Sequence, residues 1–155
     1  LKSTFPKSQR LDGLKIVIDC ANGASYISAP LILWELGAEV LPIANEPNGT
    51  NINQECGSTN TGLLAKKVIE EKADIGIALD GDGDRLAIID ENGKLVNGDQ
   101  IIALLAIEMS KTKKLKSNKV VSTSMANMGL ENYLNNDVLA LVVNFVDMLA
   151  QPLHK

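Results

Sequence analysis

Short runs of aliphatic and β-branched residues alternate along the chain with longer segments of helical spacing. The short runs are typical of buried strands, and the longer segments repeat apolar residues every three or four positions. We predict strands at 14–19, 39–43, 74–79, 86–90, 94–96 and 119–122, and helices at 29–36, 62–72, 97–111 and 127–135. This alternation predicts an α/β fold with a layered open sheet, mostly parallel with one antiparallel hairpin, and helices on both faces.

Several residues predict the ends and faces of these elements. Ser25 is a candidate N-cap for the first helix, and Gly37 fits its end. The turn at 91–93, Glu-Asn-Gly, is typical of a hairpin. We assign Trp34 of the first helix to the core. On the helix at 97–111 we assign four residues to the core face, namely Ile101, Leu104, Leu105 and Met109.

Composition argues against several functional classes. The net charge is −4 and no basic cluster is interleaved with aromatic residues, so we expect no nucleic-acid binding. The longest apolar run, residues 101–107, is too short to span a bilayer, so we expect no membrane association. Cys20 and Cys56 form no Cys-x-x-Cys pair, which favours a reducing, cytoplasmic location. The only histidine, His154, lies in a polar tail, so nothing supports Ser-His-Asp or Cys-His catalysis.

The most informative segment directly follows the strand predicted at 74–79. Residues 80–85 read Asp80-Gly81-Asp82-Gly83-Asp84-Arg85. In an extended strand, side chains four residues apart would be about 13 Å apart and could not share one ion. The intervening glycines can adopt backbone angles closed to other residues, so the loop can curl and bring the carboxylates together. This pattern predicts an all-oxygen site for a hard divalent cation, with Mg²⁺ favoured.

The residues alone leave four interpretations of this segment open. A plain acidic surface turn needs fewer acidic residues than are present. A calcium-binding EF-hand matches at ligand positions 1, 3, 5 and 12, the last being Glu91, but Arg85 replaces the glycine of position 6 and the flanking runs resemble strands. An aspartate-nucleophile phosphatase would use Asp80 and Asp82, with Asp84 where Thr or Val is usual. A metal site that serves a phosphoryl group bound elsewhere fits best, since Arg85 can donate to the same phosphate.

Five other segments accompany the acidic loop, and they lie at 18–24, 46–53, 56–59, 98–100 and 125–131. They include the sequences Pro-Asn-Gly-Thr-Asn-Ile-Asn at 47–53 and Cys-Gly-Ser-Thr at 56–59. In order and spacing, these segments and the acidic loop resemble the α-D-phosphohexomutases, and within that superfamily they are most similar to the phosphoglucosamine mutases. The resemblance covers about residues 1–135, and the tail at 137–155 diverges from the family pattern.

The resemblance implies a Mg²⁺ ion held by Asp80, Asp82 and Asp84, and a phosphate contacted by Arg85. It implies a four-domain enzyme that interconverts glucosamine 6-phosphate and glucosamine 1-phosphate through a phosphoserine and a sugar bisphosphate, on the route to peptidoglycan precursors. Residues 1–113 would form its second domain and residues 114–155 the beginning of its third.

The same resemblance limits what this chain does alone. The phosphoserine loop has no match here, so we expect no catalytic residue in this chain and no mutase activity from it in isolation. Its expected partners are the remaining domains of the same enzyme and a sugar-phosphate substrate. Phosphoglucomutase or phosphomannomutase chemistry and a non-catalytic metal-binding module remain as alternatives.

Overall fold

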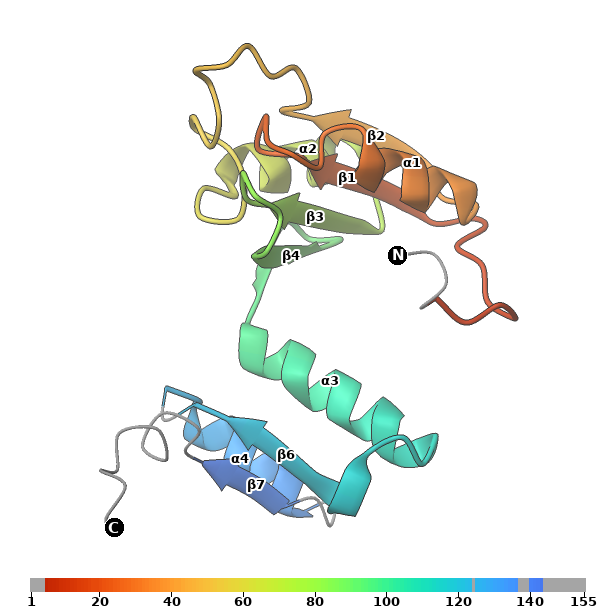
Figure 1. Ribbon diagram of the computed structural model, residues 1–155, viewed down its shortest axis with the longest axis vertical. Coiled ribbons are helices and arrows are strands. Elements are labelled where there is room, and N and C mark those ends of the chain that lie inside the picture. Colours follow the sequence, from red (N-terminus) through yellow and green to blue (C-terminus); the bar gives the residue numbers. More distant parts are fainter. Residues whose placement is uncertain (1–4, 124, 137–139, 144–155) are drawn as a thin grey trace, which may run out of the picture. The chain divides into compact units, whose positions relative to one another are not determined.

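The computed structural model describes residues 5–123, 125–136 and 140–143 (Figure 1). It divides the chain into two compact units, Leu1–Val96 and Asn97–Lys155. We expected a domain boundary after residue 113. In the sequence, the boundary between the two units instead lies between residues 96 and 97, because the helix at 98–111 packs within the second unit. His154 and most of the divergent tail lie outside the described residues.

The first unit is built on a five-stranded sheet in the order β2-β1-β3-β4-β5. Its strands are β1 (Lys15–Asp19), β2 (Glu39–Ile43), β3 (Ile75–Leu79), β4 (Leu86–Asp90) and β5 (Leu95–Val96). The central strand β1 pairs in parallel with β2 and β3. Strand β4 is antiparallel to both β3 and β5, and the turn at 91–93 joins β4 to β5 as predicted. The predicted α/β open sheet is confirmed.

Two helices cover this sheet, α1 (Ser28–Glu35) and α2 (Gly62–Glu71). Parallel crossovers are right-handed, so α1 after β1 and α2 after β2 belong on opposite faces. Figure 1 shows this arrangement, with α1 in front of the sheet and α2 behind it. Accordingly, Ile16, Val17 and Ile18 are at most 3% exposed although successive side chains point to opposite faces. Burial on both faces explains why β1 is a continuous apolar run instead of an alternating one.

The main core of the first unit lies between α2 and the sheet. Its fully buried members are Val17, Leu64, Val68, Ala73, Ala78 and Ile89. Helix α1 contributes no buried residue, and Trp34 is 65% exposed, so its assignment to the core was wrong. Ser25 does not cap α1 either, because it lies in the turn before the helix and Ile27 occupies the N-cap position.

The second unit contains α3 (Gly98–Lys111), a 3₁₀ turn at Lys116–Asn118, β6 (Lys119–Ser122), α4 (Met128–Asn136) and β7 (Ala140–Val143). Strands β6 and β7 pair in parallel. Among the residues of this unit whose burial the structure describes, Ala106, Val120, Leu130 and Leu134 are buried. Strand β7 was not predicted, because its apolar run lies in the divergent part of the sequence.

Helix α3 begins with a capping box. The Asn97 side chain accepts the backbone N–H of Gln100, and the Gln100 side chain accepts the backbone N–H of Asn97. Its predicted core face was wrong, since Leu104, Leu105 and Met109 are 69%, 56% and 40% exposed. The packed face instead carries Ile102, Ala103 and Ala106. Among the residues that the structure describes, no helix combines the length and apolar character that a bilayer crossing requires.

Candidate functional site

The acidic loop, defined as residues 80–85, connects the antiparallel strands β3 and β4. Leu79 at the end of β3 is the register partner of Leu86 at the start of β4. Because β3 is also parallel to β1, the loop leaves the sheet at the edge where β1 ends. This edge, at the carboxyl ends of parallel strands, is where open α/β sheets usually bind ligands. The predicted placement of the loop is therefore confirmed, although its chemical role is a separate question.

Three carboxylates converge in this loop. One carboxylate oxygen from each of Asp80, Asp82 and Asp84 lies within 4.8 Å of the other two. Asp80 is 1% exposed, whereas Asp82 and Asp84 are exposed to solvent. Gly83 makes the curl possible, since its φ of +76° is strained for other residues and its N–H donates to the Asp80 carbonyl at 3.0 Å. The cluster therefore consists of one buried carboxylate, that of Asp80, and two solvent-exposed carboxylates, those of Asp82 and Asp84.

Arg85 lies against Asp80 in this structure. Its backbone N–H donates to Asp80 Oδ1 at 3.0 Å, and its Nε donates to Oδ2 at 2.6 Å. The backbone N–H of Arg85 is the largest cause of a strongly lowered Asp80 pKa, and the guanidinium adds to it. The Arg85 side chain is 64% exposed. Contact of Arg85 with a phosphate stays a prediction.

Repulsion among the carboxylates affects the pKa of Asp84. The negative charges of Asp82 and then Asp80 raise the pKa of Asp84 above its ordinary value. Arg85 Nε lies 3.8 Å from Asp84 Oδ1 and offsets part of this repulsion. An oxygen-only donor set with excess negative charge suits a hard cation such as Mg²⁺ or Ca²⁺.

Two of the predicted sequence segments come together beside the acidic loop. The turn at 21–25 contributes the Ala24 N–H, which donates to the Gly81 carbonyl at 2.7 Å. The segment at 56–59 contributes the Ser58 N–H, which donates to the Leu79 carbonyl at 2.9 Å. The loop at 51–53 binds the same turn, since the Asn53 N–H donates to the Ala21 carbonyl at 2.9 Å, and a Cβ added at Gly81 would lie 2.5 Å from Ile52 Cδ1. Segments far apart in sequence therefore surround the acidic loop.

Asp19 is a buried carboxylate that the sequence analysis treated only as the end of a strand. It is 0% exposed, and its two oxygens accept the N–H groups of Ala21 at 2.9 Å and Gly57 at 2.8 Å. Burial raises the pKa of Asp19, and hydrogen bonds from Gly57 and Ala21 oppose this rise. Its bond to Gly57 joins residues 38 positions apart, so no local signal in the sequence indicated this role.

The two cysteines lie in the interior next to Asp19. Burial, followed by the nearby Asp19 charge, raises the pKa of Cys20 to about 11. The same two causes raise the pKa of Cys56. Both thiols therefore stay protonated near neutral pH, which argues against a nucleophilic role.

The EF-hand interpretation does not fit this geometry. An EF-hand loop joins two helices, whereas residues 80–85 join two paired strands. Glu91, which would be the last ligand, lies beyond β4 in the turn that leads to β5.

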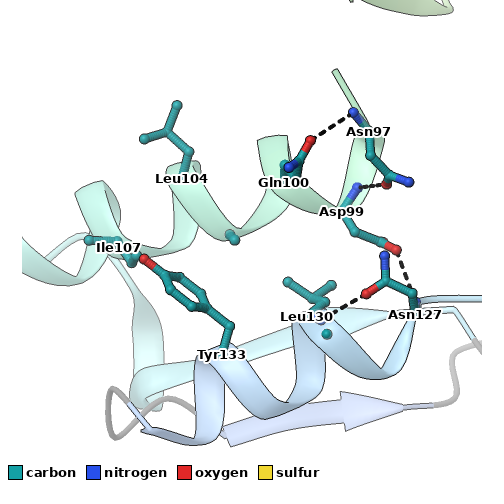
Figure 2. Close-up of a pocket in the computed structure, with 10 residues that line it drawn as sticks. Asn97, Asp99, Gln100, Leu104, Ile107, Asn127, Leu130 and Tyr133 are labelled. Atoms are coloured by element: carbon teal, nitrogen blue, oxygen red, sulfur yellow. Dashed lines mark hydrogen bonds between the residues drawn. The ribbon is translucent and has the colours of Figure 1, made fainter. Parts of the chain in front are cut away.

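The second unit contains a separate cavity of about 610 Å³ between α3 and α4 (Figure 2). Figure 2 shows Leu104, Ile107 and Tyr133 along its apolar side. At its other end Asp99 accepts the Asn127 N–H at 2.9 Å, and Asn97 accepts the Asp99 N–H at 2.9 Å. These hydrogen bonds join the start of α3 to the start of α4.

Two sequence models of the phosphoglucomutase/phosphomannomutase family match the chain. The model of alpha/beta/alpha domain II matches residues 2–93, and the model of alpha/beta/alpha domain III matches residues 97–143. The junction between the two matches agrees with the junction between the two compact units.

The chain is also similar to curated proteins named phosphoglucosamine mutase. It is 58% identical over 141 residues to that of Bartonella quintana, a match that covers 91% of this chain and 31% of the relative. It is 58% identical over 135 residues to that of Zymomonas mobilis, covering 87% of this chain and 30% of the relative. The chain thus spans about a third of the length of these relatives.

Solved structures share the fold at lower identity. A phosphoglucomutase/phosphomannomutase family protein from Burkholderia thailandensis superposes with a TM-score of 0.73 at 22% identity, covering 84% of this chain and 29% of that one. An N-acetylglucosamine-phosphate mutase in its substrate complex superposes with a TM-score of 0.64 at 19% identity, covering 92% of this chain and 30% of that one.

Proposed function

This chain belongs to the phosphoglucomutase/phosphomannomutase family, and we propose on that basis that it is the metal-binding part of a phosphoglucosamine mutase. The convergence of three carboxylate oxygens within 4.8 Å of one another is the observation that supports this function most strongly. The names of the relatives at 58% identity favour glucosamine phosphate over glucose or mannose phosphate as the substrate.

Asp80, Asp82 and Asp84 would hold the cation, and we propose that it is Mg²⁺. Their oxygen-only donors and excess negative charge suit this ion, which prefers carboxylate and water ligands. When bound, Mg²⁺ would neutralise charge on a transferring phosphoryl group and orient it. Mg²⁺ gives up its waters reluctantly, so with three protein ligands we expect weak binding to this chain alone.

The Arg85 guanidinium would supply the second contact to a phosphate. In this structure its Nε donates to Asp80, and its side chain is 64% exposed, so its remaining N–H groups can donate to a bound anion. The backbone N–H of Arg85 holds Asp80 in place independently of the side chain. Asp80 would therefore orient Arg85, while Arg85 lowers the pKa of Asp80.

The whole enzyme would interconvert glucosamine 6-phosphate and glucosamine 1-phosphate in the cytoplasm. The remaining domains of that enzyme would supply the phosphoserine and the contacts to the sugar, so this chain alone would be inactive. Formation of glucosamine 1-phosphate by the purified chain in a coupled assay would contradict the expected inactivity.

The proposed role of the acidic loop is tested by Asp82→Asn in a complete enzyme that contains this segment. Asp82 is exposed, so the substitution leaves packing unchanged while it removes one carboxylate from the cation site. We expect turnover to fall severely with an unchanged far-UV circular dichroism spectrum.

The matched control is Asp12→Asn, because Asp12 is an exposed acid that pairs with Arg10 outside the acidic loop. We expect this control to retain full turnover. Equal turnover for Asp82→Asn and the unsubstituted enzyme would refute catalysis at this loop and leave at most a non-catalytic metal-binding module.

A further inference from the structure

Asp19 connects two loops that are far apart in sequence. Its Oδ1 accepts the N–H of Ala21, and its Oδ2 accepts the N–H of Gly57. The carboxylate is 0% exposed, and burial of such a group is unfavourable unless hydrogen bonds satisfy it. These two bonds therefore fix the turn at 21–25 and the segment at 56–59 relative to the end of β1.

Each of these loops in turn binds the backbone carbonyl of a residue that flanks Asp80. On the N-terminal side, the Leu79 carbonyl accepts the Ser58 N–H at 2.9 Å. On the C-terminal side, the Gly81 carbonyl accepts the Ala24 N–H at 2.7 Å. The backbone on both sides of Asp80 is thus attached to a loop that Asp19 organises.

Glycines stand where the two loops approach the backbone around Asp80 most closely. A Cβ added at Gly23 would meet the Gly81 carbonyl oxygen and lie 2.6 Å from Gly81 Cα. A Cβ added at Gly57 would lie 2.9 Å from the Leu79 carbonyl oxygen. Both obstacles are backbone atoms, so a side chain at either position would displace the acidic loop.

We propose that Asp19 is a positioning residue for the cation site, because it connects the turn at 21–25 and the segment at 56–59, which bind the backbone carbonyls of the two residues that flank Asp80. These hydrogen bonds would orient the buried Asp80 carboxylate toward the carboxylates of Asp82 and Asp84. This inference rests on the proposed metal site. It assigns a function to a buried carboxylate that lies outside the proposed ligand set.

The test is a Mg²⁺ titration of the 155-residue chain, in which binding is measured from the NMR chemical shifts of the Gly81 and Gly83 amides. In Asp19→Asn, an amide NH₂ group replaces one carboxylate oxygen and faces the N–H of either Ala21 or Gly57. Two donors cannot bond each other, so one of the two hydrogen bonds is lost. Gly23→Ala pushes on the Gly81 carbonyl without altering any carboxylate. The matched control is Gly98→Ala, because Gly98 begins α3 and no atom lies within 4 Å of its added Cβ.

We expect the Kd for Mg²⁺ to rise by about tenfold to a hundredfold in Asp19→Asn and Gly23→Ala, the range typical when residues that support metal ligands are changed. Gly98→Ala should bind like the unsubstituted chain. The Kd is read from the amide peaks of the folded species, so loss of stability alone does not change it. If Asp19→Asn fails to fold, Gly23→Ala decides the question.

Two outcomes would overturn the inference, and they are distinguishable. A Kd for folded Gly23→Ala equal to that of Gly98→Ala would show that the loops serve only the fold, while the metal site would stand. Absence of saturable shifts in the unsubstituted chain at millimolar Mg²⁺ would remove the metal site itself, and the positioning role with it.

Discussion

Gly76 is the second residue of β3, the strand that leads to the acidic loop, and helix α2 packs on the sheet at this position. A Cβ added there would lie 2.7 Å from Val68 Cγ2 and 3.1 Å from both Ile89 Cβ and Leu64 Cδ1. All three neighbours are at most 1% exposed, and the nearest of them, Val68, cannot turn aside because the χ1 angle of a helical valine is restricted. The substitution Gly76→Ala therefore forces α2 away from the sheet by several tenths of an ångström.

The size of the effect follows from two opposing terms. Overpacking a well-filled core costs about 1–3 kcal/mol. Replacing glycine by alanine within a strand returns about 0.5–1 kcal/mol, because the unfolded chain loses conformational freedom. We therefore expect Gly76→Ala to lower the free energy of unfolding by about 0.5–2 kcal/mol.

Urea unfolding measures this change. The signals are far-UV circular dichroism and the fluorescence of Trp34, the only tryptophan, which lies in the first unit. The midpoint should fall with an unchanged m-value. The matched control is Gly62→Ala, because the nearest atom to an added Cβ there is Asn60 Oδ1 at 3.9 Å. This control should be neutral or slightly stabilising.

A double mutant gives the sharper test. Val68→Ala removes the methyl that obstructs position 76, so Gly76→Ala should cost less in that background than alone. Neighbours in contact typically show a coupling of about 0.5–3 kcal/mol. Additive effects, or a Gly76→Ala chain as stable as the unsubstituted one, would refute the packing of α2 on β3 described above.

Three further predictions concern stability. Leu134→Ala should cost about 2–5 kcal/mol, because Leu134 is 0% exposed, and amide exchange should accelerate in α4 and β6 but not in β1; uniform acceleration would contradict two separate cores. Asn97→Ala removes the α3 N-cap and should cost about 1 kcal/mol, measured by urea unfolding, whereas no change would argue against the capping box. The Lys94 N–H and then the Asn92 N–H lower the pKa of Asp90, so Asp90 stabilises the fold above its ordinary pKa and loses this effect as pH falls through the lowered value. The stability difference between the unsubstituted chain and Asp90→Asn should therefore shrink below about pH 4; a difference that is constant from neutral to acidic pH would contradict this.

The acidic loop could be predicted because its signal is local. Carboxylates at alternate positions with glycine between them are unusual in themselves, and the residues on each side carry strand patterns. The hairpin at 91–93 and strands β2, β4 and β6 were predictable for the same reason, since turn chemistry and apolar periodicity lie within a few residues. The convergence of the loop with the end of β1 followed from the parallel topology.

What could not be predicted depends on contacts between distant residues. Asp19 acquires its role from Gly57, 38 positions away, and no local pattern distinguishes it from any acidic residue at the end of a strand. Trp34 was assigned to the core because it lies on a predicted helix. In the structure, α2 contributes buried residues to the core of the first unit, whereas α1 contributes none. On α3 several apolar stripes were possible, and only the position of Val120 and Leu134 selects the one through Ala106.

The central claim is that Asp80, Asp82 and Asp84 together hold one divalent cation. Crystals of the chain soaked in Mn²⁺, which has a measurable anomalous signal, test it most directly. The account predicts a single anomalous peak bonded at about 2.1–2.2 Å to an oxygen of each carboxylate, and loss of that peak in Asp82→Asn. Crystals without a peak at this loop, with the three side chains turned apart into solvent, would contradict it.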